Sequence, residues 1–194
     1  MTARMDMPVQ AGLVDTGPGD GLSGLVLRTA RLILRPPAPR DWPAFHAFMM
    51  SDRATAFGSQ GDLARSFRSF AAELGHWQIF GIGMWAVTWA DDDIARALIG
   101  PWCPPDWPER EVGWMVLDRA AEGTGLATEA AGAAIADAYR RLGWPTVVSY
   151  VAPGNARSIR LAEKLGAVLD QDAPQPGAGA AVLVYRHPRP QGTP

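Results

Sequence analysis

The chain has 194 residues, with 20 acidic against 18 basic side chains and a net charge of −2, a size and balance typical of one ordinary globular domain. Its scattered arginines exclude the dense basic surface of a nucleic-acid-binding protein, and no apolar run approaches the roughly 20 residues that span a bilayer. The one cysteine, Cys103, excludes an internal disulfide and a cysteine-cluster metal site. We therefore expect a reducing, cytoplasmic location, with no metal and with neither nucleic acid nor membrane as partner.

The first elements are expected to follow a flexible arm. Residues 1–23 are rich in Gly, Pro and Asp and show no hydrophobic periodicity, and residues 187–194 form a similar tail, which leaves 24–186 as the domain. Alternating character around Leu32 and Leu34 then predicts one or two short strands.

Two helices are expected next. Asp41 is a suitable N-cap for the first helix, with Pro43 in its first turn. The second helix is expected between Gly61 and Gly75, where apolar residues recur at +4, +3 and +4. These residues are Leu63, Phe67, Phe70 and Leu74.

The second half of the chain alternates strands and helices. Strands are expected at 83–90, 96–102, 111–117, 146–152 and 180–186, and helices at 125–142 and from Asn155 to Gly166. Two helices, a meander of antiparallel strands and then strand–helix–strand–helix–strand form an α+β order.

A glycine pair joins the strand at 111–117 to the helix that follows. Gly123 and Gly125 are separated only by Thr124, and such a pair is suited to an ordinary turn because glycine adopts positive φ without strain. The N–H groups of a helix N-terminus also bind phosphate. A dinucleotide fingerprint would need glycine at Thr128, and a P-loop would need Gly-Lys-Ser/Thr, so neither fits.

The stretch EVGWMVLDRAAEGTGLATEAA (111–131), followed by NARSIRLAEKLGA (155–167), resembles the acetyl-CoA-binding core of the GNAT N-acetyltransferase superfamily. It is most similar to the RimJ/RimL-like branch, whose members acetylate the N-termini of ribosomal proteins. The resemblance covers about residues 24–186. It implies a mixed, mostly antiparallel central sheet with flanking helices, whose fourth and fifth strands splay around acyl-CoA.

The same resemblance implies the residues that hold acetyl-CoA. Main-chain amides of the glycine turn would bind the pyrophosphate, Asn155 would bind the pantetheine arm, and Ser158 would lie near the sulfur. N–H groups of the splayed strand would bind the thioester carbonyl. The implied residues are Met115, Val116, Gly123, Thr124, Gly125, Leu126, Ala127, Thr128, Asn155 and Ser158. Ala120 departs from the family, which has Gln or Arg there; the neighbouring Arg119 is an alternative source of charge.

For catalysis, the resemblance assigns Glu111 as the base, acting directly or through water. Glu109 and Asp106 are alternatives, and Glu111 is also consistent with a solvated carboxylate at a strand edge. Alanine occupies the position of the tyrosine acid of many relatives, so Ser158 or water would protonate the thiolate. A capping or packing serine is an equal alternative for Ser158.

The acceptor is expected over the first two helices and the loops between strands. Trp102 and Trp107, in a proline-rich loop, are candidates for a wall that receives an amine, although packing is the other role of such tryptophans. The leading hypothesis is an acetyl-CoA-dependent transferase for a protein N-terminus or small amine. The alternatives are an aminoglycoside or polyamine acetyltransferase and a non-catalytic acyl-CoA sensor. The chain is expected to be a monomer or homodimer.

Overall fold

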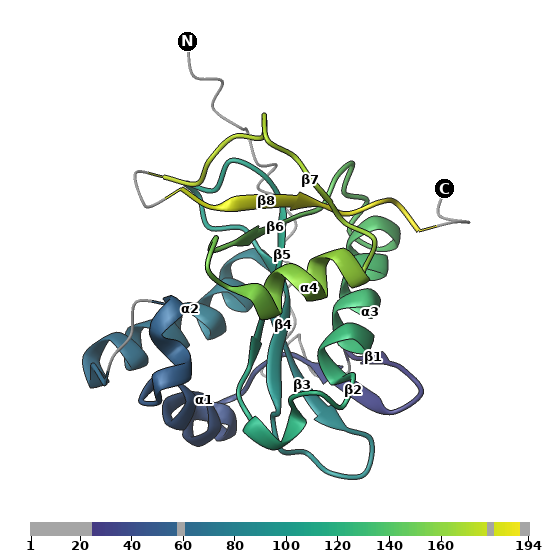
Figure 1. Ribbon diagram of the computed structural model, residues 1–194. Helices are drawn as coiled ribbons and strands as arrows, with labels where there is room; N and C mark the ends of the chain where they lie inside the picture. The colour runs from purple at the N-terminus through teal and green to yellow at the C-terminus, as the bar shows by residue number, and fades with distance from the viewer. Residues whose placement is uncertain (1–24, 58–60, 178–180, 191–194) are drawn as a thin grey trace.

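The computed structural model describes residues 25–57, 61–177 and 181–190, which form a sheet flanked by helices (Figure 1). The strands are β1 (Leu27–Arg28), β2 (Leu32–Arg35), β3 (Trp85–Trp89), β4 (Ala97–Trp102), β5 (Glu111–Val116), β6 (Val148–Val151), β7 (Val168–Leu169) and β8 (Leu183–Arg186). The helices are α1 (Trp42–Met49), α2 (Leu63–Phe80), α3 (Leu126–Arg140) and α4 (Ala156–Lys164). Short 3-10 turns occupy Pro39–Asp41, Asp52–Phe57 and Arg119–Ala121.

The eight strands form one sheet in the order β1-β2-β3-β4-β5-β6-β8-β7. Every neighbouring pair is antiparallel except β5 and β6, which are parallel and connected through α3. This arrangement confirms the predicted α+β class and its mostly antiparallel sheet.

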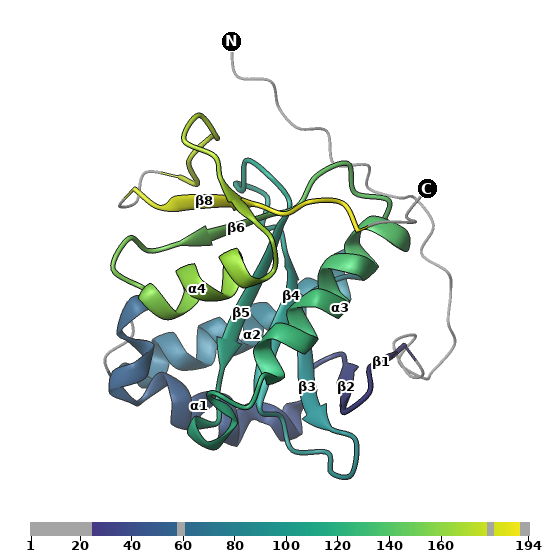
Figure 2. The ribbon, with the colours of Figure 1, turned by 45° about the vertical axis from the view of Figure 1, so that its right-hand side comes forward.

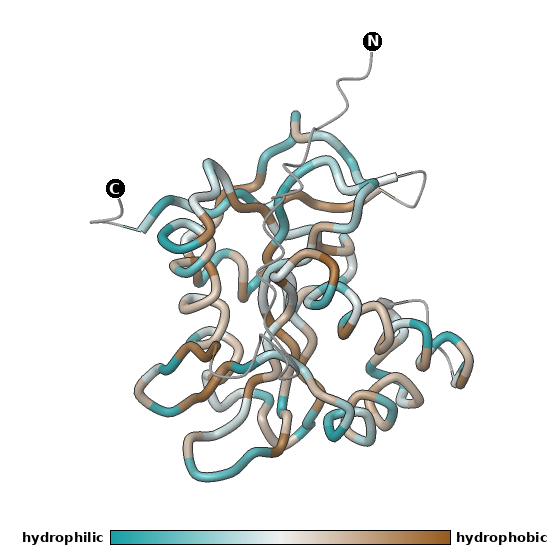
Figure 3. The backbone as a smooth tube through the Cα atoms, turned by 180° about the vertical axis from the view of Figure 1, so that it is seen from behind, coloured by the Kyte–Doolittle hydropathy of each residue, from teal (hydrophilic) through white to brown (hydrophobic). Residues whose placement is uncertain are grey.

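The helices cover opposite faces of the sheet (Figure 2). Phe45 of α1 and Phe70 of α2 pack with Leu98 and Met115 in one apolar cluster. On the other face, the alanine-rich side of α3 packs in a second cluster around Trp85, and α4 lies beside α3. Figure 3 shows that the most hydrophobic segments gather along the central strands, between these two layers.

The parallel strands β5 and β6 are paired at one position and then diverge. Glu111 pairs with Val148, and the N–H of Val148 donates to the carbonyl of Arg110. Past this point, bonds across the gap involve side chains: Ser149 Oγ donates to the carbonyl of Val112 at 2.6 Å, and the backbone of Tyr150 donates to the Glu111 carboxyl group. β5 and β6 correspond to the strands expected at 111–117 and 146–152, which are the two strands that the resemblance predicts to splay.

The second helix was predicted incorrectly. α2 does not end at Gly75 but continues to Phe80, where Gly81 with φ of 68° closes it. Its buried residues are Ser66, Phe70, Glu73, His76 and Trp77. Leu63 and Phe67, predicted to face the core, are 60% and 62% exposed, so the helix is rotated relative to the expected face.

Two smaller differences concern the ends of elements. Asp41 precedes α1 as expected, yet its carboxylate accepts from the N–H of Ala38 and from the Arg35 guanidinium and makes no cap bond. The two-residue strand β7, at the edge of the sheet, was not predicted. It follows α4 directly and pairs with β8.

Candidate functional site

A cavity of about 520 Å³ lies where β5 and β6 part. Residues of α1, α2 and β5 line it on one side of the sheet, and the start of α4 lines it on the other. It brings together six residues that the sequence singled out: Trp102, Trp107, Glu111, Met115, Asn155 and Ser158. The residues that the sequence did not single out include Phe45, Met49, Arg65, Glu73, Met84, Trp114, Ser149 and Tyr150.

Glu111 begins β5 and is only 7% exposed, which is inconsistent with a solvated strand-edge carboxylate. Burial raises the pKa of its carboxyl group to about 7, although hydrogen bonds from Trp107 and from the Tyr150 backbone oppose that rise. The indole Nε1 of Trp107 donates to Glu111 Oε2 at 2.6 Å. A carboxyl group with a pKa near neutrality, facing a cavity, can accept and release a proton at physiological pH.

The alternative bases lie in different surroundings. Glu109 forms an ion pair with Arg186 at 2.8 Å and is absent from the cavity lining. Asp106 is exposed on the loop before β5. Of the three acidic residues considered from the sequence, Glu111 is the one that lines the cavity.

A second carboxyl group, Glu73 of α2, lines the same cavity and is 4% exposed. Burial raises its pKa to about 8, and the charge of Glu111 raises it further in the same direction. Sequence reasoning missed Glu73 because it ended the helix at Gly75 and chose the wrong face. The signal was present: Glu73 stands at +3 from Phe70 and −4 from Trp77, on the buried stripe.

The main chain of β5 offers N–H groups to the gap. The N–H of Leu117 donates to Arg96 on the β4 side, whereas the carbonyl of Val112 accepts from Ser149 of β6. Because successive residues of a strand alternate in direction, the N–H groups of Trp114 and Val116 face the gap and that of Met115 faces β4. Val116 is not among the residues that line the cavity, and its carbonyl accepts from the Arg53 guanidinium at 2.6 Å, while Met115 contributes its side chain to the cavity wall.

Ser158 lies on the first turn of α4. Its N–H donates to Oδ1 of Asn155, the N-cap residue of that helix, and its Oγ accepts from Trp114 Nε1 at 3.1 Å. Since a lone pair of the hydroxyl oxygen is engaged by the indole, the hydroxyl proton is directed elsewhere. Ser158 is therefore placed as a donor, and Asn155 keeps its amide nitrogen for another partner.

The glycine turn has the geometry of an anion cradle. Gly123 and Gly125 have φ of 76° and 85°, and a Cβ added at Gly123 would meet nothing within 4 Å. The first helical bond of α3 joins the N–H of Glu129 to the carbonyl of Gly125. The N–H groups of Leu126, Ala127 and Thr128 thus have no acceptor within the helix, as in any first turn, although that of Leu126 makes a long bond of 3.4 Å to Thr124 Oγ1. These backbone groups suit a pyrophosphate.

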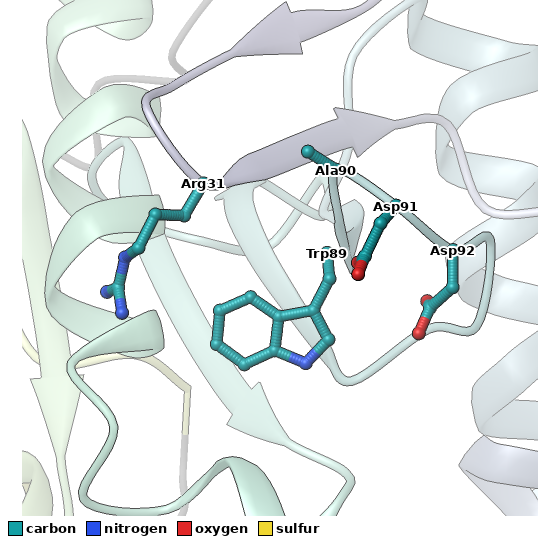
Figure 4. Close-up of a pocket in the computed structure, with 5 residues that line it drawn as sticks. All are labelled: Arg31, Trp89, Ala90, Asp91 and Asp92. Carbon is teal, nitrogen blue, oxygen red and sulfur yellow. The ribbon is translucent and has the colours of Figure 1, made fainter.

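Arg31 supports this turn from outside. Its guanidinium donates to the carbonyl of Thr124 at 3.2 Å and to Glu129 at 2.7 Å. Figure 4 shows Arg31 beside Trp89 in an open depression that also includes Asp91 and Asp92. This depression shares no lining residue with the cavity between β5 and β6, so we assign it no part in the chemistry.

Trp102 and Trp107 both line the cavity but make different contacts. Trp102 stacks on His76 with ring centroids 5.1 Å apart, whereas Trp107 holds Glu111 by the hydrogen bond described above. His76 Nε2 accepts from the N–H of the buried Cys103. Burial raises the pKa of the Cys103 thiol to about 11, which is unsuited to a nucleophile.

Among the helices of the described residues, none is long and apolar enough to cross a membrane. Within the same residues, no group of three or more His, Cys, Asp and Glu side chains is arranged to hold a metal ion.

Comparison with known proteins identifies the family. The acetyltransferase (GNAT) domain matches residues 31–168. An acetyltransferase from Agrobacterium tumefaciens is 39% identical with a TM-score of 0.78, over 85% of this chain and 95% of that one. A GnaT-family acetyltransferase from Bordetella pertussis is 28% identical with a TM-score of 0.68, over 84% and 99%.

A ribosomal-protein-S5-alanine acetyltransferase from Vibrio fischeri shares the fold at 14% identity, with a TM-score of 0.64 over 88% of this chain and 100% of that one. The family match, the 39% identical structure and the parted strands agree with one another. The chain belongs to the GNAT acetyltransferase family.

Proposed function

We propose that this acetyltransferase transfers an acetyl group from acetyl-CoA directly to a primary amine, with Glu111 as the base. The observation that carries the proposal is the position of Glu111: a buried carboxyl group with a pKa near 7, at the wall of a cavity between parted strands. GNAT domains use acetyl-CoA as cosubstrate, and the open glycine turn supports its binding here.

Different residues of the chain would bind the different parts of acetyl-CoA. The amides of Gly123 to Ala127 would bind the pyrophosphate, with a hydroxyl contact from Thr128. Asn155 would bind the pantetheine arm through its amide nitrogen. The N–H groups of Val116 and Trp114 face the gap and would donate to the thioester carbonyl, where negative charge develops during transfer. Acetyl-CoA, when bound, supplies the activated thioester.

The proton balance assigns the remaining roles. The ammonium group of the acceptor loses one proton to the Glu111 carboxylate, and the neutral amine forms the new C–N bond as the C–S bond breaks. A second proton leaves the nitrogen for solvent water as the amide forms, and the departing thiolate takes one proton from Ser158, which is resupplied by solvent, or directly from water. No covalent enzyme intermediate is needed, because the cavity holds both reactants in one complex.

For the acceptor, we propose a protein N-terminus or a small amine, as in the RimJ/RimL-like branch. The shared fold with the Vibrio fischeri enzyme is compatible with this placement. A non-catalytic acyl-CoA sensor would not require a buried acid with a pKa near neutrality facing the cavity.

The experiment is a screen of acetyl-CoA with N-terminal peptides and small amines, in which release of free thiol is measured. Thiol release that depends on an amine, and is lost in Glu111→Gln while acetyl-CoA still binds, supports the proposal. Binding of CoA without transfer to any amine would favour the sensor, and no binding of CoA would refute the central claim.

A further inference from the structure

Glu73 is a buried acidic residue to which the proposed acetyl transfer assigns no role. It lies in the middle of α2, and its Oε2 has no hydrogen-bond partner among the described residues. A buried carboxyl oxygen without a donor is costly, and the Glu73 side chain also lines the cavity, where a ligand could supply that donor.

The surroundings restrict that ligand. Phe45, Met49, Met84 and Trp102 form apolar walls of the cavity, and Glu73 and Glu111 are the two carboxyl groups that line it. An ammonium group has three N–H donors and can reach two carboxyl groups at once. In a cavity of low dielectric constant such charge-assisted bonds are stronger than in water.

We propose that Glu73 is the counter-ion for the ammonium group of the acceptor, which enters as a protonated primary amine on a slender aliphatic stem. This inference rests on the proposed function, since it takes the cavity as the acceptor site. In the complex, Glu73 is ionised and holds the nitrogen, while Glu111 removes a proton from that nitrogen. Glu73 is thus a specificity-determining residue, distinct from the base.

The same cavity disfavours a polyamine as acceptor. Arg65 lines the cavity on the same helix, eight residues or about 12 Å before Glu73. Its positive charge opposes the second and third ammonium groups of a polyamine, so the cavity favours an acceptor with a single charge.

Binding of a cation should also release a proton. Burial and the charge of Glu111 raise the pKa of Glu73, so its carboxyl group is mostly protonated in the free protein at pH 7. The other ionisable side chains that line the cavity are Arg65, Glu111 and Tyr150. A bound ammonium group stabilises the carboxylate, and the proton of the acid passes to the buffer.

The test uses n-butylammonium and n-butanol as matched charged and neutral probes, titrated calorimetrically into the full-length protein saturated with CoA. The wild type should bind n-butylammonium at least about tenfold more tightly than n-butanol. Glu73→Gln should remove this preference, while the affinity for CoA stays unchanged. Glu163→Gln makes the same charge change on the exposed side of α4 and should behave as wild type.

Two further measurements separate binding from structural damage. Titration in two buffers of different ionisation enthalpy should show proton release on n-butylammonium binding in the wild type, and less in Glu73→Gln. Glu73→Met, an apolar replacement of similar size, should shift the preference toward n-butanol, which a merely misfolded variant would not do.

The outcomes distinguish this inference from the proposed function. Equal n-butylammonium binding by wild type and Glu73→Gln, or no preference for the cation in the wild type, overturns the role of Glu73. If the wild type binds the cation through Glu73 but transfers acetyl to no amine, the proposed function fails while the cation site stands.

Discussion

The indole N–H of Trp107 and the carboxylate of Glu111 are joined by a 2.6 Å hydrogen bond at the entrance to β5. Trp107 thereby fixes the direction of the proposed base and favours its ionised form. Because Trp107 precedes Glu111 by four residues on a proline-rich loop, one short segment supplies both the base and the group that tunes it.

Trp107→Phe should raise the pKa of Glu111, since the hydrogen bond that stabilises the carboxylate is lost. The base must be ionised to act, so kcat/KM should rise with pH through about 7 in the wild type. In the variant this rise should move to higher pH by about one unit. The dependence of kcat/KM on pH is measured for the wild type and for Trp107→Phe. An unchanged profile in the variant would show that the hydrogen bond has no influence on the base.

Glu111→Gln should lower kcat by about 100-fold or more, because the amide cannot accept the proton of the acceptor. Binding of acetyl-CoA, followed by thermal shift, should persist. Glu163→Gln serves as the control for the loss of one negative charge. Turnover at the wild-type rate in Glu111→Gln would remove Glu111 from the role of base.

Gly125→Ala should weaken acetyl-CoA binding and reduce stability by about 1–2 kcal/mol, because a side chain at φ of 85° is strained. The matched control is Gly75→Ala within α2, where a Cβ would meet nothing within 4 Å. That change should instead stabilise the protein by about 0.5–1 kcal/mol. Urea unfolding and the KM for acetyl-CoA measure the two effects, and equal behaviour of the two variants would contradict the assigned geometry.

Ser158→Ala should lower kcat about tenfold while the KM of the amine stays constant, if Ser158 protonates the thiolate. Trp114→Phe removes the bond that directs the Ser158 hydroxyl and should cause a smaller loss of the same kind. The double variant should be no slower than Ser158→Ala, because the two side chains act through one hydroxyl. Additive losses would show that they act separately.

Glu73 should make the protein less stable as pH rises. Its pKa is about 8 in the folded protein against an ordinary 4.5, so the folded state binds more protons between these values. The contribution of Glu73 to stability is therefore fully present at low pH and is lost as pH rises through the folded pKa. The free energy of unfolding of Glu73→Gln should exceed that of the wild type by more than about 1 kcal/mol at pH 8.5 and by little at pH 5. Urea unfolding at both values tests this, and a pH-independent difference would contradict it.

Local patterns of the sequence were sufficient for most of the fold. The strands on either side of Asp91, the helix after the glycine turn and the start of α4 at Asn155 were all predicted, because each has strong periodicity or a capping residue. The end of α2 was not. A glycine inside a helix costs only about 1 kcal/mol, and tertiary packing of Trp77 compensates for Gly75 in a way that local reading does not include.

The residues of the candidate site also fall into those that the sequence predicts and those that it does not. Glu111 and Ser158 could be placed from motifs that recur in the family. The hydrogen bonds by which Trp107 and Trp114 hold them could not be predicted, because tryptophan in a sequence is as consistent with packing as with hydrogen bonding. Glu73 was missed for a different reason: ending the helix at Gly75 left Trp77 out of the apolar pattern, and the rotation of α2 that buries Glu73 is set by contacts with α1 and the sheet.

The parting of β5 and β6 also has a mechanical consequence. In the described residues, main-chain pairing joins the two strands at Glu111 and Val148 alone, so the sheet is nearly divided into two cooperative folding units. We expect the unit of β6, β7, β8 and α4 to open at lower free energy than the rest and to exchange its amide protons faster. A ligand bound between β5 and β6 would replace the missing main-chain contacts between the two strands. The rigidity of the molecule would then depend on whether that ligand is bound.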